Sequence, residues 1–186
     1  MNLLHHFFKK PIEKKFDENV NSIILGMGCF WGVEKIFWNS YGVEMTAVGY
    51  SGGTKENPTY QEVCSGLTGH NEVVLVNFNK NKISLEDILR LFWEGHDPTQ
   101  GMRQGNDIGS QYRSGIYTVS DSDFETALIT KKKYQILLEE KNFGKITTEI
   151  LKAKTFYYAE DYHQQYLSKN PNGYCGIGGT GVKFKI

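Results

Sequence analysis

SIILGMGCFWGVEKIF, residues 22–37, decides the fold, because it predicts a strand that turns directly into a helix. The strand is expected over residues 22–25, and Gly26 and Gly28 permit a sharp turn after it. From Cys29 onward, apolar side chains recur at helical spacing with polar residues between them. The chain therefore begins its ordered part with a β-strand followed by an α-helix.

The alternation of strands and helices continues along the chain. We expect further strands over residues 44–50, 70–79, 115–119 and 146–151, and helices over 58–64, 85–92 and 123–141. Asn57 and Ser84 are residue types that cap a helix start, and Pro58 suits a first helical position. The aromatic cluster at 156–166 is predicted to be partly helical. This order is typical of a two-layer α/β domain.

A length of 186 residues suits one domain with a sizeable core. We expect residues 1–20 to form a polar, weakly packed lead-in, and residues 21–186 to form a single domain that includes a mobile tail over 170–186. The glycine-rich segment 95–111 predicts a long ordered loop, and loops of that length are usually functional.

Acidic and basic residues balance, because 21 Lys and Arg face 21 Asp and Glu. This balance argues against broad electrostatic binding to nucleic acid or anionic lipid. No apolar run approaches membrane-spanning length, and the N-terminal lysines follow the apolar residues, which is the reverse of a secretory signal. We therefore expect a cytoplasmic, monomeric protein without nucleic-acid or membrane partners.

The three cysteines, Cys29, Cys64 and Cys175, show neither a CxxC pair nor the spacing of a zinc site. An odd number of cysteines fits a reducing compartment, where such residues are buried, catalytic or redox-active. The five histidines show no HExxH pattern, so we expect no bound metal.

Cys29 stands where the first helix begins. Unsatisfied backbone N–H groups and the positive end of the helix dipole favour the thiolate, which is the nucleophilic form. A buried, space-filling cysteine is the alternative, and position alone leaves both open. Phe30 and Trp31 favour the nucleophile, because consecutive helical residues point about 100° apart and cannot both serve one core stripe. At least one ring should line a cleft beside the thiol, although Phe30 could equally be a core residue.

Glu72 lies at the start of the strand HNEVVLVNF and, by alternation, shares a face with Val74, Val76 and Phe78. A carboxyl group on that apolar face would be partly desolvated, which raises its pKa and makes it a candidate proton donor. A solvated strand end with an ordinary pKa is the commoner arrangement.

Cys175 lies in NGYCGIGGTG, where five glycines between 173 and 181 free the backbone. A thiol on such a segment can reach a sulfenic acid formed elsewhere and convert it to a disulfide, provided that the two Cα atoms come within about 7 Å. A frayed terminus that carries an incidental cysteine is the alternative.

Four longer motifs resemble the A-type peptide methionine sulfoxide reductases. They are GCFWG at 28–32, NPTYQEVCSGLTGHNEVV at 57–74, HDPTQGMRQGNDIGSQYRS at 96–114, and AEDYHQQYL with NPNGYCGIGGTG at 159–167 and 170–181. The motifs follow the family's order and cover nearly the whole chain. The resemblance implies a two-layer α/β sandwich with a mixed sheet and a ferredoxin-like core, and the activity of a peptide-methionine (S)-S-oxide reductase.

The resemblance also implies a role for each matching position. These positions are Cys29 as the nucleophile, Cys175 as the resolving cysteine, Glu72 as the acid that protonates the sulfoxide oxygen, Tyr60 and Tyr112 as supporting hydroxyls, Asp107 as a further acidic position of the substrate site, and Phe30 and Trp31 as the pocket for the substrate methyl group. The implied substrates are oxidised proteins and free methionine sulfoxide. A thioredoxin-like dithiol would restore the thiols without any bound cofactor.

The tail departs from some family members, which carry another cysteine where this chain has Lys183. The Cys29–Cys175 disulfide would therefore be the one presented to the reductant. Cys64 is expected to be a packed structural thiol that shares a helix face with Tyr60.

Two other functions fit part of the pattern. A papain-like cysteine hydrolase also begins a helix at its cysteine and places a histidine about 130–150 residues downstream, a range that includes His163. The hydrolase motif is otherwise absent, and we expect His163 to be a hydrogen-bonded packing residue. A non-catalytic module that binds oxidised methionine would keep Phe30 and Trp31 but need neither Cys29 nor Cys175.

Overall fold

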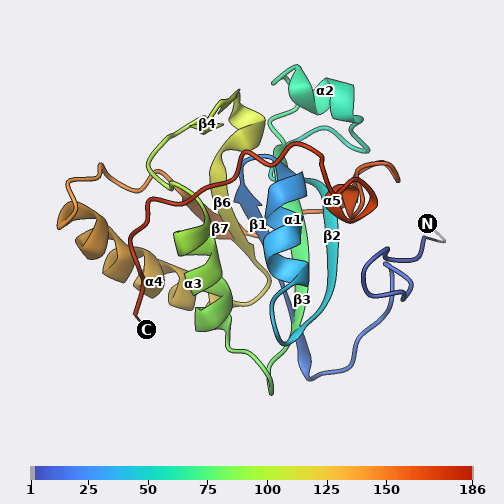
Figure 1. Ribbon diagram of the computed structural model, residues 1–186, viewed down its shortest axis with the longest axis horizontal. Helices are drawn as coiled ribbons and strands as arrows, with labels where there is room; N and C mark the ends of the chain where they lie inside the picture. The colour runs from blue at the N-terminus through green and yellow to red at the C-terminus, as the bar shows by residue number, and fades with distance from the viewer. Residues whose placement is uncertain (1–2, 186) are drawn as a thin grey trace.

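The protein consists of a mixed six-stranded sheet with helices on one face (Figure 1). The computed structural model describes residues 3–185. Its strands are β1 (Val20–Met27), β2 (Val43–Ser51), β3 (Asn71–Asn79), β6 (Ser114–Thr118), β7 (Glu149–Lys152) and β8 (Tyr157–Tyr158). A separate hairpin joins β4 (Arg103–Gln104) and β5 (Asp107–Ile108). The helices are α1 (Phe30–Trp38), α2 (Tyr60–Cys64), α3 (Leu85–Gly95), α4 (Asp121–Glu139) and α5 (Tyr166–Lys169), with a 3₁₀ turn η1 (Ser110–Tyr112). Residues 1 and 2 of the expected lead-in and residue 186 of the expected tail lie outside the described residues.

The strand order in the sheet is β7-β6-β1-β3-β2-β8. Neighbouring strands are antiparallel, except that β6 and β7 are parallel. In chain order, β1, α1, β2, β3, α3 and β6 form two βαβ-type halves whose strands lie side by side as β6-β1-β3-β2, the ferredoxin-like arrangement. The expected two-layer α/β fold with a mixed sheet is confirmed.

The main core lies between the sheet and the helix layer. Helices α1 and α3 lie in front of the central strands in Figure 1, and α4 packs beside α3 and along β6 and β7. Because side chains alternate along a strand, Leu25 and Val76 enter this core, whereas Ile24 and Val73 form a smaller cluster on the opposite face.

Two local expectations are wrong. Asn57 has a left-handed φ of 45°, and α2 begins after Thr59, where the Thr59 and Glu62 side chains form a reciprocal capping box. The two hydrogen bonds of this capping box stabilise a helix start after Thr59 more than Asn57 and Pro58 stabilise one two residues earlier. The aromatic cluster at 156–166 forms strand β8 and turns, with α5 beginning only at its end.

The lead-in is held to the rest of the chain at a few points. His5 is fully buried, and its Nε2 lies 2.9 Å from Thr46 Oγ1 on β2. The His6 backbone N–H donates to the Gln165 side chain at 3.1 Å, which joins the lead-in to the start of α5. The expectation of weak packing is wrong at His5 and Ile12, which are buried, whereas most other described side chains of the lead-in are exposed.

The glycine-rich tail crosses the helix layer, as Figure 1 shows where it passes in front of α1 and descends beside α3. Val182 and Phe184, near its end, are buried in the main core. The mobility of the tail stays a prediction, whereas its last described residues are fixed by the burial of Val182 and Phe184.

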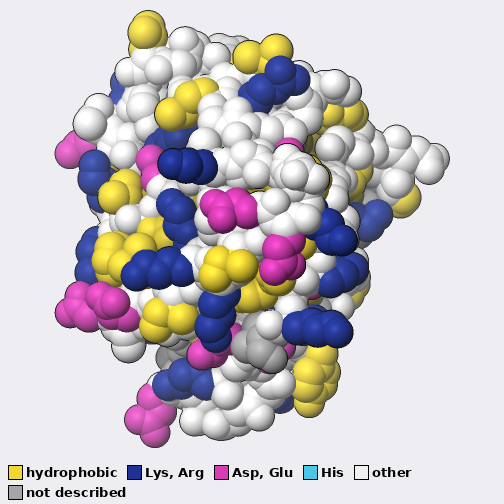
Figure 2. All heavy atoms as spheres, turned by 90° about the vertical axis from the view of Figure 1, so that its left-hand side faces the viewer, with side chains coloured by type: hydrophobic (Ala, Val, Ile, Leu, Met, Phe, Trp, Pro, Cys, Tyr) yellow, Lys and Arg dark blue, Asp and Glu magenta, His cyan; other side chains and the backbone are white. Residues whose placement is uncertain are grey.

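The surface on the α4 side mixes basic, acidic and hydrophobic side chains without a field of one sign (Figure 2). This mixture agrees with the zero net charge of the chain. Within residues 3–185, no helix has the length and apolar character needed to cross a membrane.

Candidate active site

Cys29 is the N-cap residue of α1, directly after β1. Gly28 makes the connecting turn with a φ of 95°, and a methyl group on it would lie 2.7 Å from the Gln104 side chain. Glycine accepts both this backbone conformation and the close approach. The turn therefore fixes the half-buried thiol at the start of the helix, as the sequence predicted.

A cavity of about 170 Å³ opens beside this thiol. Its lining consists of Cys29, Phe30, Trp31, Tyr60, Glu72, Asp107, Tyr112 and Tyr174. Every predicted site residue except Cys175 therefore lines one cavity, although five different elements or loops supply them.

Phe30 and Trp31 form the aromatic side of the cavity in different ways. Phe30 is buried, with its ring centroid 6.0 Å from that of Tyr50. Trp31 is half-buried, stacks on Tyr166 at 3.9 Å, and donates its indole N–H to His163 Nδ1 at 3.1 Å. Phe30 therefore belongs to both the core and the cavity lining. Trp31 forms one wall of the cavity, and its contacts with Tyr166 and His163 fix its position.

Glu72 is 1% exposed, and the backbone N–H of Phe30 donates to its Oε2 at 3.2 Å. Burial raises the pKa of Glu72 to about 8, because the hydrogen bond from Phe30 only partly offsets the desolvation of the carboxylate. The solvated strand end, the commoner alternative, is wrong here. At neutral pH this side chain carries a proton that it can donate.

The expectation that the helix N-terminus favours a Cys29 thiolate is wrong for the resting site. Burial, followed by the negative charge of Glu72, raises the pKa of Cys29 to about 12, and the N–H of Trp31 lowers it by less. Desolvation penalises the charged thiolate more than the helix end stabilises it. The resting site therefore holds a thiol beside a carboxylic acid.

Tyr60 on α2 and Tyr112 in η1 bring hydroxyl groups to the same cavity. Burial raises the pKa of both phenols above the ordinary value, so both stay protonated as hydrogen-bond donors. Asp107 on β5 completes the polar side, and burial raises its pKa also.

Cys175 is exposed and unpaired, and lies on the tail segment that crosses α1. A methyl group on Gly32 would lie 3.1 Å from Cys175 Sγ. Because residues three apart share a helix face, Gly32 marks the same side of α1 as Cys29. The tail therefore brings the second thiol to the first turn of the helix that begins at the first thiol.

Sequence reasoning missed two residues of the site. Tyr174 lines the cavity, and its hydroxyl lies 3.4 Å from Asp107 Oδ2. Its position next to Cys175 was a usable signal. Glu160 accepts from the Tyr50 hydroxyl at 2.8 Å and from the Tyr60 backbone N–H at 2.9 Å, which ties α2 to the sheet. No local pattern marks that role.

Two other predictions about the site have different outcomes. Cys64 is exposed, so a packed structural thiol is wrong: it is the last residue of a short surface helix. His163 is buried and hydrogen-bonded to Trp31, which confirms the packing interpretation.

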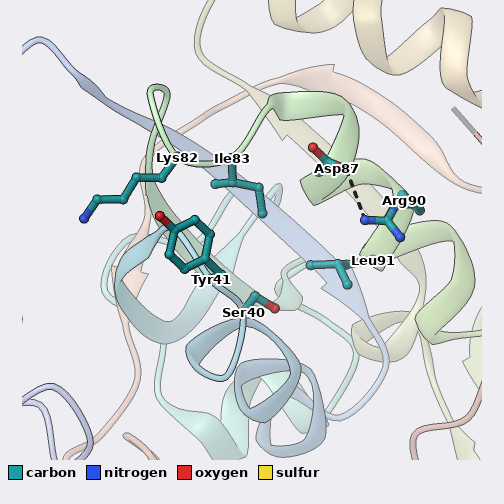
Figure 3. Close-up of a pocket in the computed structure, with 7 residues that line it drawn as sticks. All are labelled: Ser40, Tyr41, Lys82, Ile83, Asp87, Arg90 and Leu91. Carbon is teal, nitrogen blue, oxygen red and sulfur yellow. Dashed lines mark hydrogen bonds and ion pairs between the residues drawn. The ribbon is translucent and has the colours of Figure 1, made fainter.

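A second hollow lies at the far end of α1 (Figure 3). Its carboxylate, Asp87, pairs with Arg90 at 3.1 Å, and the Tyr41 ring stands beside Lys82 at its mouth. None of the residues that line it carries a thiol, so it offers no counterpart to the chemistry beside Cys29.

A family model described as peptide methionine sulfoxide reductase matches residues 21–183. The chain belongs to this family. A peptide methionine sulfoxide reductase from Synechocystis sp. is 58% identical over 182 residues, which cover 97% of this chain and 82% of the relative. The mitochondrial peptide methionine sulfoxide reductase of Homo sapiens is also 58% identical, and the match covers 98% of this chain and 77% of the relative.

Solved structures of the reductase family share the fold. Methionine sulfoxide reductase A of Corynebacterium diphtheriae superimposes with a TM-score of 0.84 at 43% identity, covering 90% of this chain and 82% of that one. Mxr1 of Saccharomyces cerevisiae in reduced form gives a TM-score of 0.80 at 37% identity, covering 87% and 92%. Mxr1 has also been solved in complex with Trx2, with a TM-score of 0.58 at 27% identity, covering 83% of this chain and 90% of that one.

As a peptide methionine sulfoxide reductase, the protein is an oxidoreductase that reduces methionine sulfoxide. The papain-like hydrolase and the non-catalytic binding module are therefore wrong. The family match extends from β1 into the tail, so it includes every site residue predicted from the sequence.

Proposed function

We propose that Cys29 is the nucleophile and Glu72 the acid in reduction of the S epimer of methionine sulfoxide, both free and in oxidised proteins. Cys29 Sγ attacks the sulfoxide sulfur while Glu72 protonates the oxygen. Attack forms an S–S bond between Cys29 and the substrate sulfur. The hydroxyl then passes from the substrate sulfur to Cys29 Sγ, so that the substrate S–O bond and the S–S bond both break, Cys29 becomes a sulfenic acid, and methionine leaves. The thiol proton re-protonates the Glu72 carboxylate, so atoms and charge balance.

The observation that carries this proposal is a thiol and a protonated carboxylic acid on one small cavity. Sulfoxide oxygen leaves only if it is protonated, and Glu72, with a pKa of about 8, holds that proton at neutral pH. Tyr60 and Tyr112 supply further donors toward the same oxygen. Without a raised pKa, Glu72 would be ionised and unable to act as an acid.

The cavity also supports selection of one epimer. Phe30 and Trp31 offer an apolar wall for the methyl group, while Glu72 and the phenols offer donors for the oxygen. With Cys29 on a third side, only one epimer of the sulfoxide can place its methyl group on the apolar wall, its oxygen toward the donors and its sulfur toward Cys29. Asp107 is proposed to position the substrate's polar backbone beside Tyr174.

We propose that Cys175 then attacks the Cys29 sulfenic sulfur. A disulfide forms, and the oxygen leaves as water with the Cys175 thiol proton. A thioredoxin-like dithiol reduces this disulfide by exchange and needs no bound cofactor. The support is Mxr1, a family member that has been solved in complex with Trx2.

The proposed setting is the repair of oxidised proteins in a reducing compartment such as the cytoplasm. Cys64 and Cys175 are exposed and unpaired, which suits surroundings that keep thiols reduced. Residues 21–186 are proposed to act as one catalytic domain, to which the lead-in is attached through contacts such as those of His5 and His6.

The test follows both epimers of a methionine sulfoxide peptide with native protein, Cys29→Ser and Cys175→Ser. We expect native protein to consume the S epimer alone, and Cys29→Ser to consume neither. Cys175→Ser should release one equivalent of methionine and then fail to turn over with thioredoxin. Activity that survives in Cys29→Ser, or consumption of the R epimer, would overturn the proposal.

A further inference from the structure

The end of the tail is attached to α3 and α4 by hydrogen bonds. The Phe184 backbone N–H donates to Glu94 Oε1 at 2.7 Å. The Tyr134 hydroxyl donates to the Val182 carbonyl at 3.1 Å and lies 3.2 Å from Thr180 Oγ1. Phe184 is 3% exposed and Tyr134 fully buried, so these bonds lie within the core layer. We call this contact set the tail anchor.

Two glycines let the tail lie directly on the helices between the anchor and Cys175. A methyl group on Gly179 would lie 1.9 Å from the Glu94 carbonyl oxygen. A methyl group on Gly32 would lie 2.8 Å from Ile177 Cγ2. Real Cβ atoms do not approach backbone atoms this closely, so the tail keeps its course only while Gly179 remains glycine.

The anchor also limits how far Cys175 can travel. Thr180 is five residues beyond Cys175, and an extended chain spans at most about 3.5 Å per residue. An anchored Thr180 therefore confines Cys175 to within roughly 18 Å even if the intervening residues detach. A short tether of this kind raises the effective concentration of one thiol at another.

We infer that Glu94 and Tyr134 are positioning residues for the resolving step, because they dock the tail and thereby hold Cys175 beside Cys29. This inference rests on the proposed function, in which Cys175 displaces the oxygen from the Cys29 sulfenic acid. In that step the S–S bond forms, the S–O bond breaks, and water leaves with the Cys175 proton. Glu94 and Tyr134 touch neither sulfur, so they affect the rate of this step and not the first reduction.

The tail offers a matched pair of substitutions. Gly179→Ala inserts a methyl group against the Glu94 carbonyl, whereas Gly178→Ala inserts one where nothing lies within 4 Å. Neither glycine has a positive φ, so alanine suits the backbone of both. The two variants stiffen the unfolded tail equally and differ only in docking.

Each variant is mixed with one equivalent of the S-sulfoxide peptide, without reductant. Methionine release reports the first step, and alkylation followed by mass spectrometry reports the Cys29–Cys175 disulfide. We expect methionine release at the native rate in both variants. Disulfide formation should slow about tenfold in Gly179→Ala, with sulfenic acid accumulating, and remain native in Gly178→Ala.

Substitutions on the other side of the anchor give an independent measurement. Glu94→Ala removes the acceptor of the Phe184 N–H, whereas Glu94→Gln keeps an amide oxygen there. We expect slow disulfide formation in the alanine variant and rescue in the glutamine variant. Lys183→Ala removes only an exposed ion pair with Glu94 and should be native.

The outcomes separate this inference from the proposed function. If native protein releases no methionine, or if Cys29→Ser does, the proposed function fails before the tail is compared. If the first step holds and Gly179→Ala forms its disulfide as fast as Gly178→Ala, the positioning role is wrong. If Glu94→Ala fails to fold, the comparison of Gly179→Ala with Gly178→Ala still decides, because Gly179 lies outside the core.

Discussion

Two buried glutamates, Glu72 and Glu34, make contacts at helix α1, and their surroundings differ. Glu72 lies on β3 at the start of the helix and receives one hydrogen bond, from the Phe30 N–H, among the contacts of the described residues. Glu34 lies within the helix and receives three: from the Thr46 hydroxyl at 3.0 Å and from the Gln165 backbone and side chain at 2.8 Å each.

The comparison separates a carboxyl group that can give a proton from one that holds structure together. Burial raises both pKa values, to about 8 for Glu72 and about 7 for Glu34. Glu72 lines the cavity beside Cys29 and receives one hydrogen bond among the described residues, so its proton is available to a ligand. Glu34 faces donors only, which bind its oxygens and connect α1, β2 and α5. Burial alone therefore does not identify an acid catalyst.

The largest effect should come from Glu72→Gln. The amide keeps the shape of the side chain but cannot donate an acidic proton, so the rate of methionine release in the first turnover should fall about 10²- to 10⁴-fold. Rapid-quench measurement of methionine gives this rate. The matched control is Glu34→Gln, which should stay within a few-fold of native. Equal loss in the two variants would erase the distinction between the two glutamates.

Glu34→Ala should have the opposite profile. Three buried donors lose their acceptor, which should lower the free energy of unfolding by about 3 kcal/mol. Urea denaturation with an unchanged m-value would measure this loss. The first-turnover rate per folded molecule should remain close to native. Native stability in this variant would show that the Glu34 contacts contribute nothing to the fold.

The rate of the first turnover should fall about tenfold for each pH unit above about 8, because Glu72 then loses its proton. Glu72→Gln should show no such decline in that range. A native profile that stays flat from pH 7 to 10 would contradict the assignment of Glu72 as the acid.

The same pKa predicts a change of stability with pH. The pKa of Glu72 is higher in the folded state, about 8, than its ordinary value of 4.5. Its contribution to stability is therefore complete below about pH 4.5 and disappears as the pH rises through about 8. Native protein should lose stability relative to Glu72→Gln between pH 5 and pH 9, as thermal melts at both values would record.

The smallest effect should come from Thr46→Val. This change removes the hydroxyl that donates to Glu34 and accepts from His5, and should cost about 1–2 kcal/mol. For a chain of this size that lowers Tm by roughly 2–8 °C. Activity should not change. A loss of epimer selectivity in this variant would mean that the Glu34 network reaches the cavity after all.

The sequence predicted the positions of the site residues better than it predicted the pKa of the Cys29 thiol. Motif spacing located Cys29 at a helix start and Glu72 on the apolar strand face, and both places are confirmed. The pKa of Cys29 was predicted in the wrong direction, because the helix dipole is local whereas desolvation depends on distant residues that close over the thiol.

Long-range packing explains the other differences. Glu34 reads as an ordinary polar helix residue, since its partners Thr46 and Gln165 come from other elements. The burial of His5 could not be predicted for the same reason, because its partner Thr46 lies on a strand some forty residues later. Strand order could not be read from element lengths, although the element types could.

The contact between the lead-in and residue 165 has a consequence for synthesis of the protein on the ribosome. His6 and Glu34 are translated early, but Gln165, to which both bind, emerges late. Phe184, which caps the core through Glu94, emerges later still. A nascent chain therefore exposes the thiol of Cys29 before the segments that pack on α1 and α3 have been made.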